Sequence, residues 1–332
     1  MRIYQEKDLQ NDMLRDAKTA VLGYGNQGHA HAMNLRDSGV DVVVGARERG
    51  GGWSRALDDG FQTLPIGEAV ERAEYVVVLL PDEVQGKVFR EEIQPHLKKQ
   101  AALVFAHGFA VAFGAVAPPA GHDVLLVAPK GQGHYLRKLY GENKGLPCLI
   151  AIENDASGAA LDKGISYAHA LGCLRVGAIE TTFREEAITD LFGEQTVLCG
   201  GVPKLVKAAF ETLVERGYRP EIAYLECLHE LKIITDLMHS GGVAAMRERI
   251  SRTAAWGSYL SEGRIVSKDL RAEMSSILDE IESGEFATGW QREAAEGQTH
   301  LSKLIHDEAA HPIERAGAQV RDLMPYLKEE EW

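Results

Sequence analysis

Two pairs of carboxylates, each four positions apart, are the residues of this chain whose spacing points most directly to chemistry. Asp190 and Glu194 form the first pair, and Glu226 and Glu230 form the second. Residues four apart lie on one face of an α-helix, so each pair would bring two carboxylates together. Like charges at this spacing destabilise a helix by roughly a few tenths of a kcal/mol. A positively charged group or ion that offsets the repulsion is therefore expected.

Apolar residues around the second pair predict that it is buried. They lie on its own face and over much of the remaining helix surface: Ile222, Ala223, Leu225, Leu228, Leu231, Ile233 and Leu237. A helix that is apolar nearly all round packs in an interior, where two carboxylates must be neutralised. Salt bridges to Arg or Lys are one interpretation. Oxygen coordination of two Mg²⁺ ions, or of Mn²⁺ as a substitute, is the other, and both pairs in a chain with a dinucleotide motif favour it.

The dinucleotide motif is Gly23-Tyr24-Gly25-Asn26-Gln27-Gly28, which follows an apolar strand-like run and precedes a helix expected at 29–36. Glycines at this spacing permit a tight turn and a close approach of the backbone to a pyrophosphate. The free N–H groups of the helix N-terminus would bind the phosphates. A tight turn without a ligand is the alternative, but the strand–turn–helix context favours a dinucleotide site.

The end of the second predicted strand bears on which dinucleotide is bound. NAD enzymes usually carry Asp or Glu there to bind the ribose 2′-hydroxyl, whereas this chain has Arg47-Glu48-Arg49. Two arginines suit a 2′-phosphate, and Glu48 between them argues in the other direction. Solvated loop charges are the alternative interpretation of both arginines.

Two further polar residues, His107 and Lys130, follow predicted strands at 102–106 and 124–128. The carboxyl ends of strands form the ligand crevice of an open α/β sheet, which makes each residue an acid–base candidate. A structural or solvated role is the alternative for both. Spacing alone does not rank His29, His31, His134 and His229.

The elements that would position these residues divide the chain in two. The first part alternates helical stretches with β-branched runs, as in a parallel α/β sheet, with strands predicted at 19–23, 40–45, 75–80, 102–106, 124–128, 147–152 and 174–178. From Thr182 onward helical patterns replace the strands, with breaks at Arg219-Pro220, Gly241-Gly242 and Gly263. We predict a Rossmann-type α/β domain over residues 1–181 and an all-α domain over residues 182–327.

Composition excludes several classes of function. The formal net charge of −13 over 332 residues, without a basic stripe, argues against a nucleic-acid partner. No apolar run is long enough to span a bilayer, so no membrane partner is expected, and the first residues do not form a signal peptide. The four cysteines lack a CxxC pair, which favours reduced thiols and a cytoplasmic location over a disulfide framework or a zinc site.

Together these motifs resemble those of the short, single-knot class of ketol-acid reductoisomerases, also called acetohydroxy acid isomeroreductases. The resemblance runs nearly from end to end, and no other family known to us joins this glycine motif to two such carboxylate pairs. The matching segments are Gly23-Tyr24-Gly25-Asn26-Gln27-Gly28-His29-Ala30, Leu80-Pro81-Asp82-Glu83-Val84, Phe105-Ala106-His107-Gly108-Phe109, Ala128-Pro129-Lys130-Gly131, Glu180-Thr181-Thr182-Phe183, Asp190-Leu191-Phe192-Gly193-Glu194-Gln195, Glu226-Cys227-Leu228-His229-Glu230-Leu231 and Ile250-Ser251-Arg252-Thr253-Ala254. The resemblance implies that the helical domain is knotted.

The resemblance also implies a role for each candidate residue. Asp190 would bridge two Mg²⁺ ions, with Glu194 on one ion and Glu226 and Glu230 around the other. His107 matches a catalytic histidine. Lys130, together with Glu230 or a hydroxide on the metal, would handle the proton, and Ser251 would hold the substrate carboxylate. The implied cofactor site comprises Gly23, Tyr24, Gly25, Asn26, Gln27, Gly28, Arg47, Arg49, Gly50, Gly52, Leu80, Pro81, Asp82 and Gly133.

The implied reaction has two steps, a Mg²⁺-dependent alkyl migration and a reduction by NAD(P)H. The substrate would be the acetohydroxy acid 2-acetolactate or 2-aceto-2-hydroxybutanoate, and the product the 2,3-dihydroxy acid of valine or isoleucine synthesis. In this family a homodimer shares its active sites, so Glu226, Glu230 and Ser251 would come from the partner subunit. Some members assemble dimers further into dodecamers.

One loop departs from the family pattern. The family usually carries Ser at the positions of Gly50 and Gly52, before a tryptophan that is Trp53 here, and those hydroxyls contact the 2′-phosphate. This chain retains Arg47 and adds Arg49, but both hydroxyls are missing. The glycine N–H groups could still form an anion-binding nest. We therefore predict that NADPH is used and that NADH is tolerated more than is usual in the family.

Two other functions compete with this interpretation. A metal-free β-hydroxyacid dehydrogenase also joins a dinucleotide domain to helices and uses a catalytic lysine, but it has no need of two carboxylate pairs. A dinucleotide-sensing regulatory module would bind the cofactor without turnover, and Asp190→Asn would have little effect on it.

Overall fold

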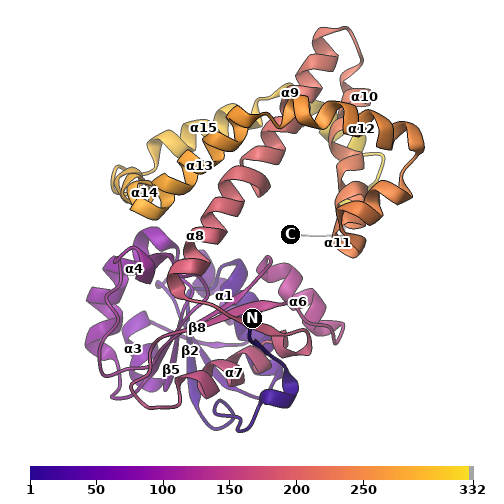
Figure 1. The fold of residues 1–332 in the computed structure, drawn as a ribbon. Helices are drawn as coiled ribbons and strands as arrows, with labels where there is room; N and C mark the ends of the chain where they lie inside the picture. The colour runs from indigo at the N-terminus through magenta and orange to yellow at the C-terminus, as the bar shows by residue number, and fades with distance from the viewer. Residues whose placement is uncertain (329–332) are drawn as a thin grey trace. The chain divides into compact units, whose positions relative to one another are not determined.

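The computed structural model describes residues 1–328 and divides into two compact units (Figure 1). The first unit, Met1–Thr189, is α/β, and in the second, which begins at Asp190, all the described elements are helical. The division falls within one helix, α8 (Phe183–Gly193). No helix among residues 1–328 combines the length and apolar character needed to cross a membrane. The predicted fold class, a Rossmann-type domain followed by a helical domain, is confirmed.

A nine-stranded sheet forms the centre of the first unit, in the order β1-β9-β8-β7-β6-β5-β2-β3-β4. The strands are β1 (Ile3–Tyr4), β2 (Lys18–Leu22), β3 (Asp41–Gly45), β4 (Gln62–Leu64), β5 (Tyr75–Val78), β6 (Ala102–Phe105), β7 (Val124–Pro129), β8 (Cys148–Asn154) and β9 (Ala178–Glu180). The six strands from β4 to β7 are parallel and follow the strand order of a dinucleotide-binding sheet.

Helices cover both faces of this sheet (Figure 1). The helical segments of the first unit are η1 (Glu6–Asp8), α1 (Asn26–Asp37), α2 (Gly51–Asp58), α3 (Ile66–Arg72), α4 (Asp82–Val88), η2 (Phe89–Ile93), η3 (Gln94–His96), α5 (Phe109–Ala112), α6 (Gly133–Gly141), α7 (Ala160–Ala170) and η4 (Cys173–Arg175). Successive residues of a strand belong to opposite cores: Val77 packs with α1, α6 and α7, whereas Val76 and Val78 pack with α3 and η2. Burial on both faces explains why β5, β6 and β7 are apolar without alternation.

The sheet differs from the prediction at its far edge. Six predicted strands are present within a few residues, but the strand predicted at 174–178 is wrong, because η4 occupies 173–175 and β9 begins at Ala178. Gly177, at φ 150°, separates the two elements. The sheet is also not wholly parallel, since β8 runs antiparallel to β7 and β1 antiparallel to β9. The short strands β1 and β4 have too few residues to show a periodic pattern.

A buried ion pair joins β7 to α7 at the end of the sheet opposite the glycine motif. Asp123 directly precedes β7, is 1% exposed, and pairs with Lys163 of α7. Its carboxylate also accepts hydrogen bonds from the N–H (2.9 Å) and hydroxyl (2.7 Å) of Ser157. Burial acts to raise the pKa of Asp123, but the bonds from Lys163 and Ser157 outweigh it, so the pKa lies below its ordinary value.

We expect Asp123→Asn to lower the free energy of unfolding by about 3 kcal/mol at pH 7, because it leaves the Lys163 ammonium buried and unpaired. A carboxylate whose pKa is lowered by folding stabilises fully above its unfolded pKa, about 3.9, and this contribution is lost as pH falls through the folded pKa. Urea unfolding at pH 7 and pH 3 should therefore show a difference that shrinks at low pH. Asp162→Asn, on the same helix, is the control and should cost about 1 kcal/mol or less. A penalty for Asp123→Asn that is equal at both pH values would contradict this account.

The second unit has a small core and a largely exposed apolar surface. Its segments after α8 are η5 (Glu194–Leu198), α9 (Gly201–Glu215), α10 (Pro220–Tyr224), η6 (Leu225–His229), α11 (Glu230–Arg249), α12 (Arg252–Ile265), α13 (Lys268–Ser283), α14 (Glu285–Ala295), α15 (Thr299–Ala309), α16 (Pro312–Arg321) and η7 (Pro325–Lys328). The core joins α9, α10 and α16 through residues such as Phe210, Tyr224 and Ile313. Among residues 1–328, 23 large apolar side chains are exposed, six in the first unit and 17 in the second. The exposed apolar side chains of the described residues are therefore concentrated in the second unit.

Two of the three predicted helix breaks are found in the second unit. Pro220 begins α10, and Gly242 interrupts α11 with a non-helical backbone (φ 82°, ψ 170°). The break predicted at Gly263 is wrong, because this residue lies inside α12. A glycine costs only about 1 kcal/mol within a helix, so the helix can continue through it.

Candidate active site

The glycine motif lies between β2 and α1, where its outer glycines are required by close backbone approach. Gly23 has a left-handed backbone (φ 91°), and a Cβ there would lie 2.6 Å from the Leu79 carbonyl oxygen. A Cβ at Gly28 would lie 2.1 Å from the Gly23 carbonyl oxygen. Around Gly25, by contrast, a Cβ would meet nothing within 4 Å. The turn is thus closed on its protein side and open at Gly25, as a pyrophosphate at the N-terminus of α1 would require.

Two neighbouring loops contact the glycine motif. The loop after β7 is joined to it by hydrogen bonds from His134 N to Asn26 Oδ1 (2.9 Å) and from Gln27 Nε2 to the Gly131 carbonyl (3.0 Å). A Cβ at Gly133 would lie 2.2 Å from the Asn26 carbonyl oxygen, which explains the glycine.

The loop after β5 carries the predicted residues Leu80, Pro81 and Asp82. A Leu80 methyl group would lie 3.3 Å from a Cβ at Gly23. Pro81 is the N-cap of α4, which begins at Asp82, and Asp82 Oδ1 accepts from Gln85 Nε2 (3.0 Å). The structure therefore places Leu80 beside the glycine turn, and a role of this loop in cofactor binding stays a prediction.

The loop between β3 and α2 carries Arg47, Arg49 and Gly50, and Gly52 lies in the first turn of α2. Arg47 and Arg49 are exposed, Arg49 has a left-handed backbone (φ 59°), and Gly50 N donates to the Arg47 carbonyl (3.0 Å). A Cβ at Gly52 would lie 3.4 Å from Tyr24. The start of α2 therefore adjoins Tyr24, which lies between the first two glycines of the motif.

Two residues that the sequence did not single out hold Tyr24 in place. Its hydroxyl donates to Asp59 Oδ2 (2.8 Å), and its carbonyl accepts from Arg55 Nη2 (3.1 Å). Burial, reinforced by Asp59, raises the pKa of Tyr24 well above its ordinary value. Tyr24 is therefore a neutral, fixed wall between the glycine turn and the loop after β3.

A buried carboxylate brings the two acid–base candidates together. His107 follows β6, Lys130 follows β7, and Glu186 lies in the first turn of α8. Glu186 is 1% exposed and accepts from Lys130 Nζ at 2.6 Å and from the Gly108 N–H at 2.7 Å, and it lies 3.0 Å from His107 Nδ1. Glu186 was not among the predicted site residues. It lies four residues before Asp190 on the same helix, so the four-residue spacing of Asp190 and Glu194 could have indicated it.

The neighbours of Glu186 keep it ionised. Burial acts to raise its pKa, but the hydrogen bond with His107 and the charges of His107 and Lys130 outweigh it, so the pKa of Glu186 lies below its ordinary value. An ionised Glu186 fixes the position of the lysine ammonium. It also orients the imidazole of His107, whose Nδ1 lies 3.0 Å from the carboxylate.

Asp190 lies one turn beyond Glu186 on α8. Donor atoms of His107, Glu186 and Asp190 all lie within 4.8 Å of one another, and within residues 1–328 no other group of three or more His, Cys, Asp or Glu side chains meets this closely. Carboxylate oxygens are the ligands that Mg²⁺ prefers, so the donor set of α8 fits that ion.

The second carboxylate pair does not join the cluster around Asp190 in the part of the chain that the structure describes. Glu226 lies in η6 and Glu230 begins α11, and neither belongs to the cluster around Asp190. Both are exposed, as are Ile222 and Ile233 on their face, so the predicted burial is wrong for the chain by itself. The reason is that, among the described residues, no segment packs over this face.

Ser251 is also exposed, and its local role is structural. It is the N-cap of α12, and its Oγ accepts a hydrogen bond from the Ala254 N–H (3.1 Å). This bond uses an acceptor lone pair of the hydroxyl, and a hydroxyl can still donate its hydrogen to a substrate carboxylate.

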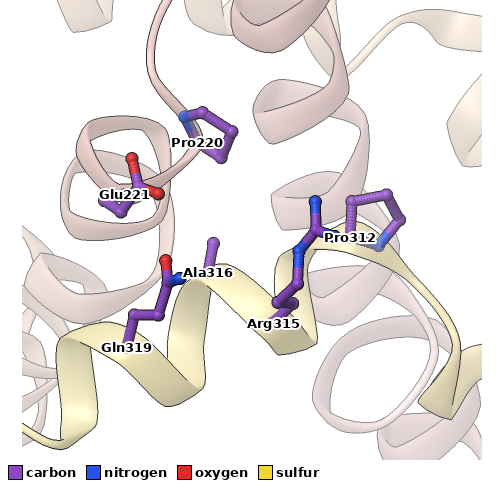
Figure 2. Close-up of a pocket in the computed structure, with 6 residues that line it drawn as sticks. All are labelled: Pro220, Glu221, Pro312, Arg315, Ala316 and Gln319. Atoms are coloured by element: carbon purple, nitrogen blue, oxygen red, sulfur yellow. The ribbon is translucent and has the colours of Figure 1, made fainter.

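A separate cavity of about 240 Å³ lies between α10 and α16 of the second unit (Figure 2). Its lining residues are Pro220, Glu221, Pro312, Arg315, Ala316 and Gln319. None of them is a predicted site residue, so this cavity is distinct from the candidate active site.

Comparison with family models places two matching domains along the chain. Residues 13–177 match the model of the acetohydroxy acid isomeroreductase NADPH-binding domain. Residues 183–326 match the model of the ketol-acid reductoisomerase C-terminal domain. The residues between the two matches, 178–182, include β9, the last strand along the chain.

Solved structures agree with this division. An NADH-preferring ketol-acid reductoisomerase from an uncultured archean is 42% identical, with a TM-score of 0.95 over 98% of this chain and 99% of that one. More distant matches share the fold alone. A semialdehyde dehydrogenase NAD-binding protein from Cupriavidus necator is 18% identical (TM-score 0.61, 80% of this chain and 99% of that one). An oxidoreductase from Jannaschia is 16% identical (TM-score 0.59, 80% and 97%).

Proposed function

Because the chain belongs to the ketol-acid reductoisomerase family, and is thus an NAD(P)H-dependent oxidoreductase, we propose the two-step reaction that it catalyses. Mg²⁺-dependent alkyl migration converts 2-acetolactate or 2-aceto-2-hydroxybutanoate to a 3-hydroxy-2-keto acid, which is then reduced to the 2,3-dihydroxy acid of valine or isoleucine synthesis. The observation that carries this proposal is the Glu186 cluster. It joins His107 and Lys130 next to Gly131, which is hydrogen-bonded to the glycine motif, and Asp190 follows on the same helix.

The migration needs a proton to be moved but none to be consumed. The alkyl group leaves carbon 2 with its bonding electrons and joins the ketone carbon 3, while the carbon-2 hydroxyl loses its proton and the carbon-3 oxygen gains one. Lys130, held by Glu186, would carry the proton between these oxygens. Mg²⁺ bound by Asp190 and Glu194, with Glu226 and Glu230, would polarise the ketone as a Lewis acid.

The reduction uses the cofactor end of the site. Lys130 or His107 would donate one proton to the new carbon-2 carbonyl oxygen, and a bound NAD(P)H would supply the hydride to its carbon. Ser251 would hold the substrate carboxylate, and the oriented imidazole of His107 would hold the reacting oxygens.

A second copy of this chain would complete the site. The 17 exposed apolar side chains of the second unit, and the exposure of Glu226 and Glu230 on an apolar helix, support a homodimer in which these glutamates face Asp190 and Glu194 of the partner. In such an interface the four carboxylates would be buried, and two Mg²⁺ ions bound by them would neutralise their charges. The knotted arrangement of the helical domain belongs to the same proposal.

The activity is tested by following acetolactate-dependent oxidation of NADPH and NADH with and without Mg²⁺. We expect oxidation only when acetolactate and Mg²⁺ are both present. Activity that survives complete removal of divalent cations would favour a metal-free β-hydroxyacid dehydrogenase instead. Cofactor binding without any turnover would favour the dinucleotide-sensing module.

For the cofactor, we expect NADPH to be used with a kcat/KM preference over NADH of less than about 1,000-fold, or about 4 kcal/mol. Arg47 and Arg49 attract a 2′-phosphate, but Gly50 and Gly52 provide no hydroxyls for it. Gly52→Ser should raise the preference, because a Cβ fits there at 3.4 Å from Tyr24. Kinetics of both proteins with both cofactors would check this, and a wild-type preference above that limit would reject the loosened specificity.

A further inference from the structure

A wide helical turn follows Glu194. The segment η5 is π-helical and joins α8 to α9. The Glu194 carbonyl accepts two hydrogen bonds, from the Cys199 N–H (2.8 Å) and the Gly200 N–H (3.0 Å). In an α-helix the donor would be the residue four positions later, so the chain here takes a wider path.

Two consecutive glycines permit this turn. A Cβ at Gly200 would lie 2.0 Å from the Gln195 carbonyl oxygen, and a Cβ at Gly201 would lie 2.1 Å from the Thr196 carbonyl oxygen. Separations below 3.0 Å essentially never occur for real Cβ atoms, and a backbone carbonyl cannot swing aside as a side chain can. Any larger residue at either position must therefore open or shift the turn. The backbone of Gly200 (φ −93°) is ordinary, so close approach is the reason for glycine.

Gly193, immediately before Glu194, is different. A Cβ at Gly193 would meet nothing within 4 Å, and the backbone is α-helical (φ −60°, ψ −42°). Gly193 thus has room for an alanine side chain, whereas Gly200 and Gly201, seven and eight residues later, do not.

A π-helical turn also accompanies the second carboxylate pair. The segment η6 includes Glu226, and the Glu230 N–H donates to the Leu225 carbonyl, five residues back. Single π-turns inside helices occur frequently at functional sites. Both pairs therefore combine a four-residue spacing with a local widening of the helix.

We infer that Gly200 and Gly201 are positioning residues for the metal site, because they allow the wide turn that fixes the Glu194 backbone and so the direction of its carboxylate relative to Asp190. This inference rests on the proposed role of Glu194 as a Mg²⁺ ligand. It adds two residues that touch neither metal nor substrate.

The test is Mn²⁺ binding to the full-length protein, measured by electron paramagnetic resonance and calorimetry, for wild type, Gly200→Ala, Gly201→Ala and the control Gly193→Ala. We expect Gly200→Ala and Gly201→Ala to bind Mn²⁺ about 10- to 100-fold more weakly than wild type. Loss of a residue that orients a metal ligand typically has an effect of this size. NADPH affinity should stay at the wild-type value, and the KM for Mg²⁺ should rise while kcat recovers at saturating Mg²⁺. Gly193→Ala should match wild type in every measurement.

A milder variant covers the case in which these alanines prevent folding. Thr196→Val removes the bond from Thr196 Oγ1 to the Phe192 carbonyl (2.7 Å) that ties the turn to α8, and it keeps the side-chain volume. A severalfold weaker Mn²⁺ affinity with unchanged NADPH affinity would support the inference. Unchanged Mn²⁺ affinity in the folded variants would overturn it, as would equal losses of Mn²⁺ and NADPH binding. Absence of Mn²⁺ binding by wild type would instead overturn the proposed metal site.

Discussion

Glu186→Gln is expected to lower kcat by about 100-fold or more while leaving the affinity for NADPH unchanged. The glutamine amide places a donor against Lys130 or His107, and it removes the buried charge that both of them face at 3.0 Å or less. The proton steps would then lose a correctly placed acid–base group, which typically contributes 10²- to 10⁴-fold. Single-turnover kinetics and a fluorescence titration with NADPH measure the two quantities separately.

Glu185→Gln is the matched control for this variant. Glu185 is the preceding residue of α8 but is exposed, and it accepts a hydrogen bond from Thr181 Oγ1 at 2.6 Å. We expect kcat close to that of wild type. If Glu186→Gln kept the wild-type kcat, or if both variants lost activity equally, the Glu186 cluster would not be the acid–base centre.

Mixed dimers should show that two chains build each active site. Homodimers of Asp190→Asn or of Glu230→Gln should lose about 10³-fold in activity, because each lacks a metal ligand worth several kcal/mol of transition-state stabilisation. A dimer of one Asp190→Asn chain and one Glu230→Gln chain should regain about half of the wild-type activity. In a shared arrangement one of its sites carries both substitutions and the other carries neither.

The reciprocal dimer distinguishes this arrangement from a site within one chain. It pairs a wild-type chain with a chain that carries both Asp190→Asn and Glu230→Gln. Shared sites would each receive one substitution, so this dimer should be inactive. If instead the reciprocal dimer kept half of the activity and the mixed dimer had none, each site would lie within a single chain. Co-expression with two affinity tags allows both species to be purified.

The parts of the site that the sequence predicts are those determined locally. Gly28 is required by a contact within one strand–turn–helix unit, and Gly23 has the left-handed backbone of the same turn, so their spacing suffices to identify them. His107 and Lys130 follow strands whose parallel order brings their carboxyl ends together. The strands themselves are apolar runs bounded by polar turns, which explains why six of them were predicted within a few residues.

The missed features depend on contacts between distant segments. Glu186 is a charged residue of a type usually found at the surface, and only the fold shows that it is buried against Gly108 and Lys130, which follow β6 and β7. The apolar residues of β8 do not indicate that this strand runs antiparallel to β7. Burial of Glu226 and Glu230 was predicted from a helix that is apolar nearly all round, but among the described residues no segment covers these two side chains. The four-residue spacing of the carboxylates does not indicate the π-helical turns η5 and η6.

If one site rearranges the carbon skeleton and then reduces it, the position of the transferred hydride in the product records both steps. The most direct test supplies 2-acetolactate, Mg²⁺ and NADPH deuterated at the transferred position, and locates the deuterium in the product by NMR. We expect 2,3-dihydroxy-3-methylbutanoate, with two methyl groups on carbon 3 and deuterium on carbon 2. Deuterium on carbon 3 of 2,3-dihydroxy-2-methylbutanoate would mean reduction without migration and would contradict this expectation.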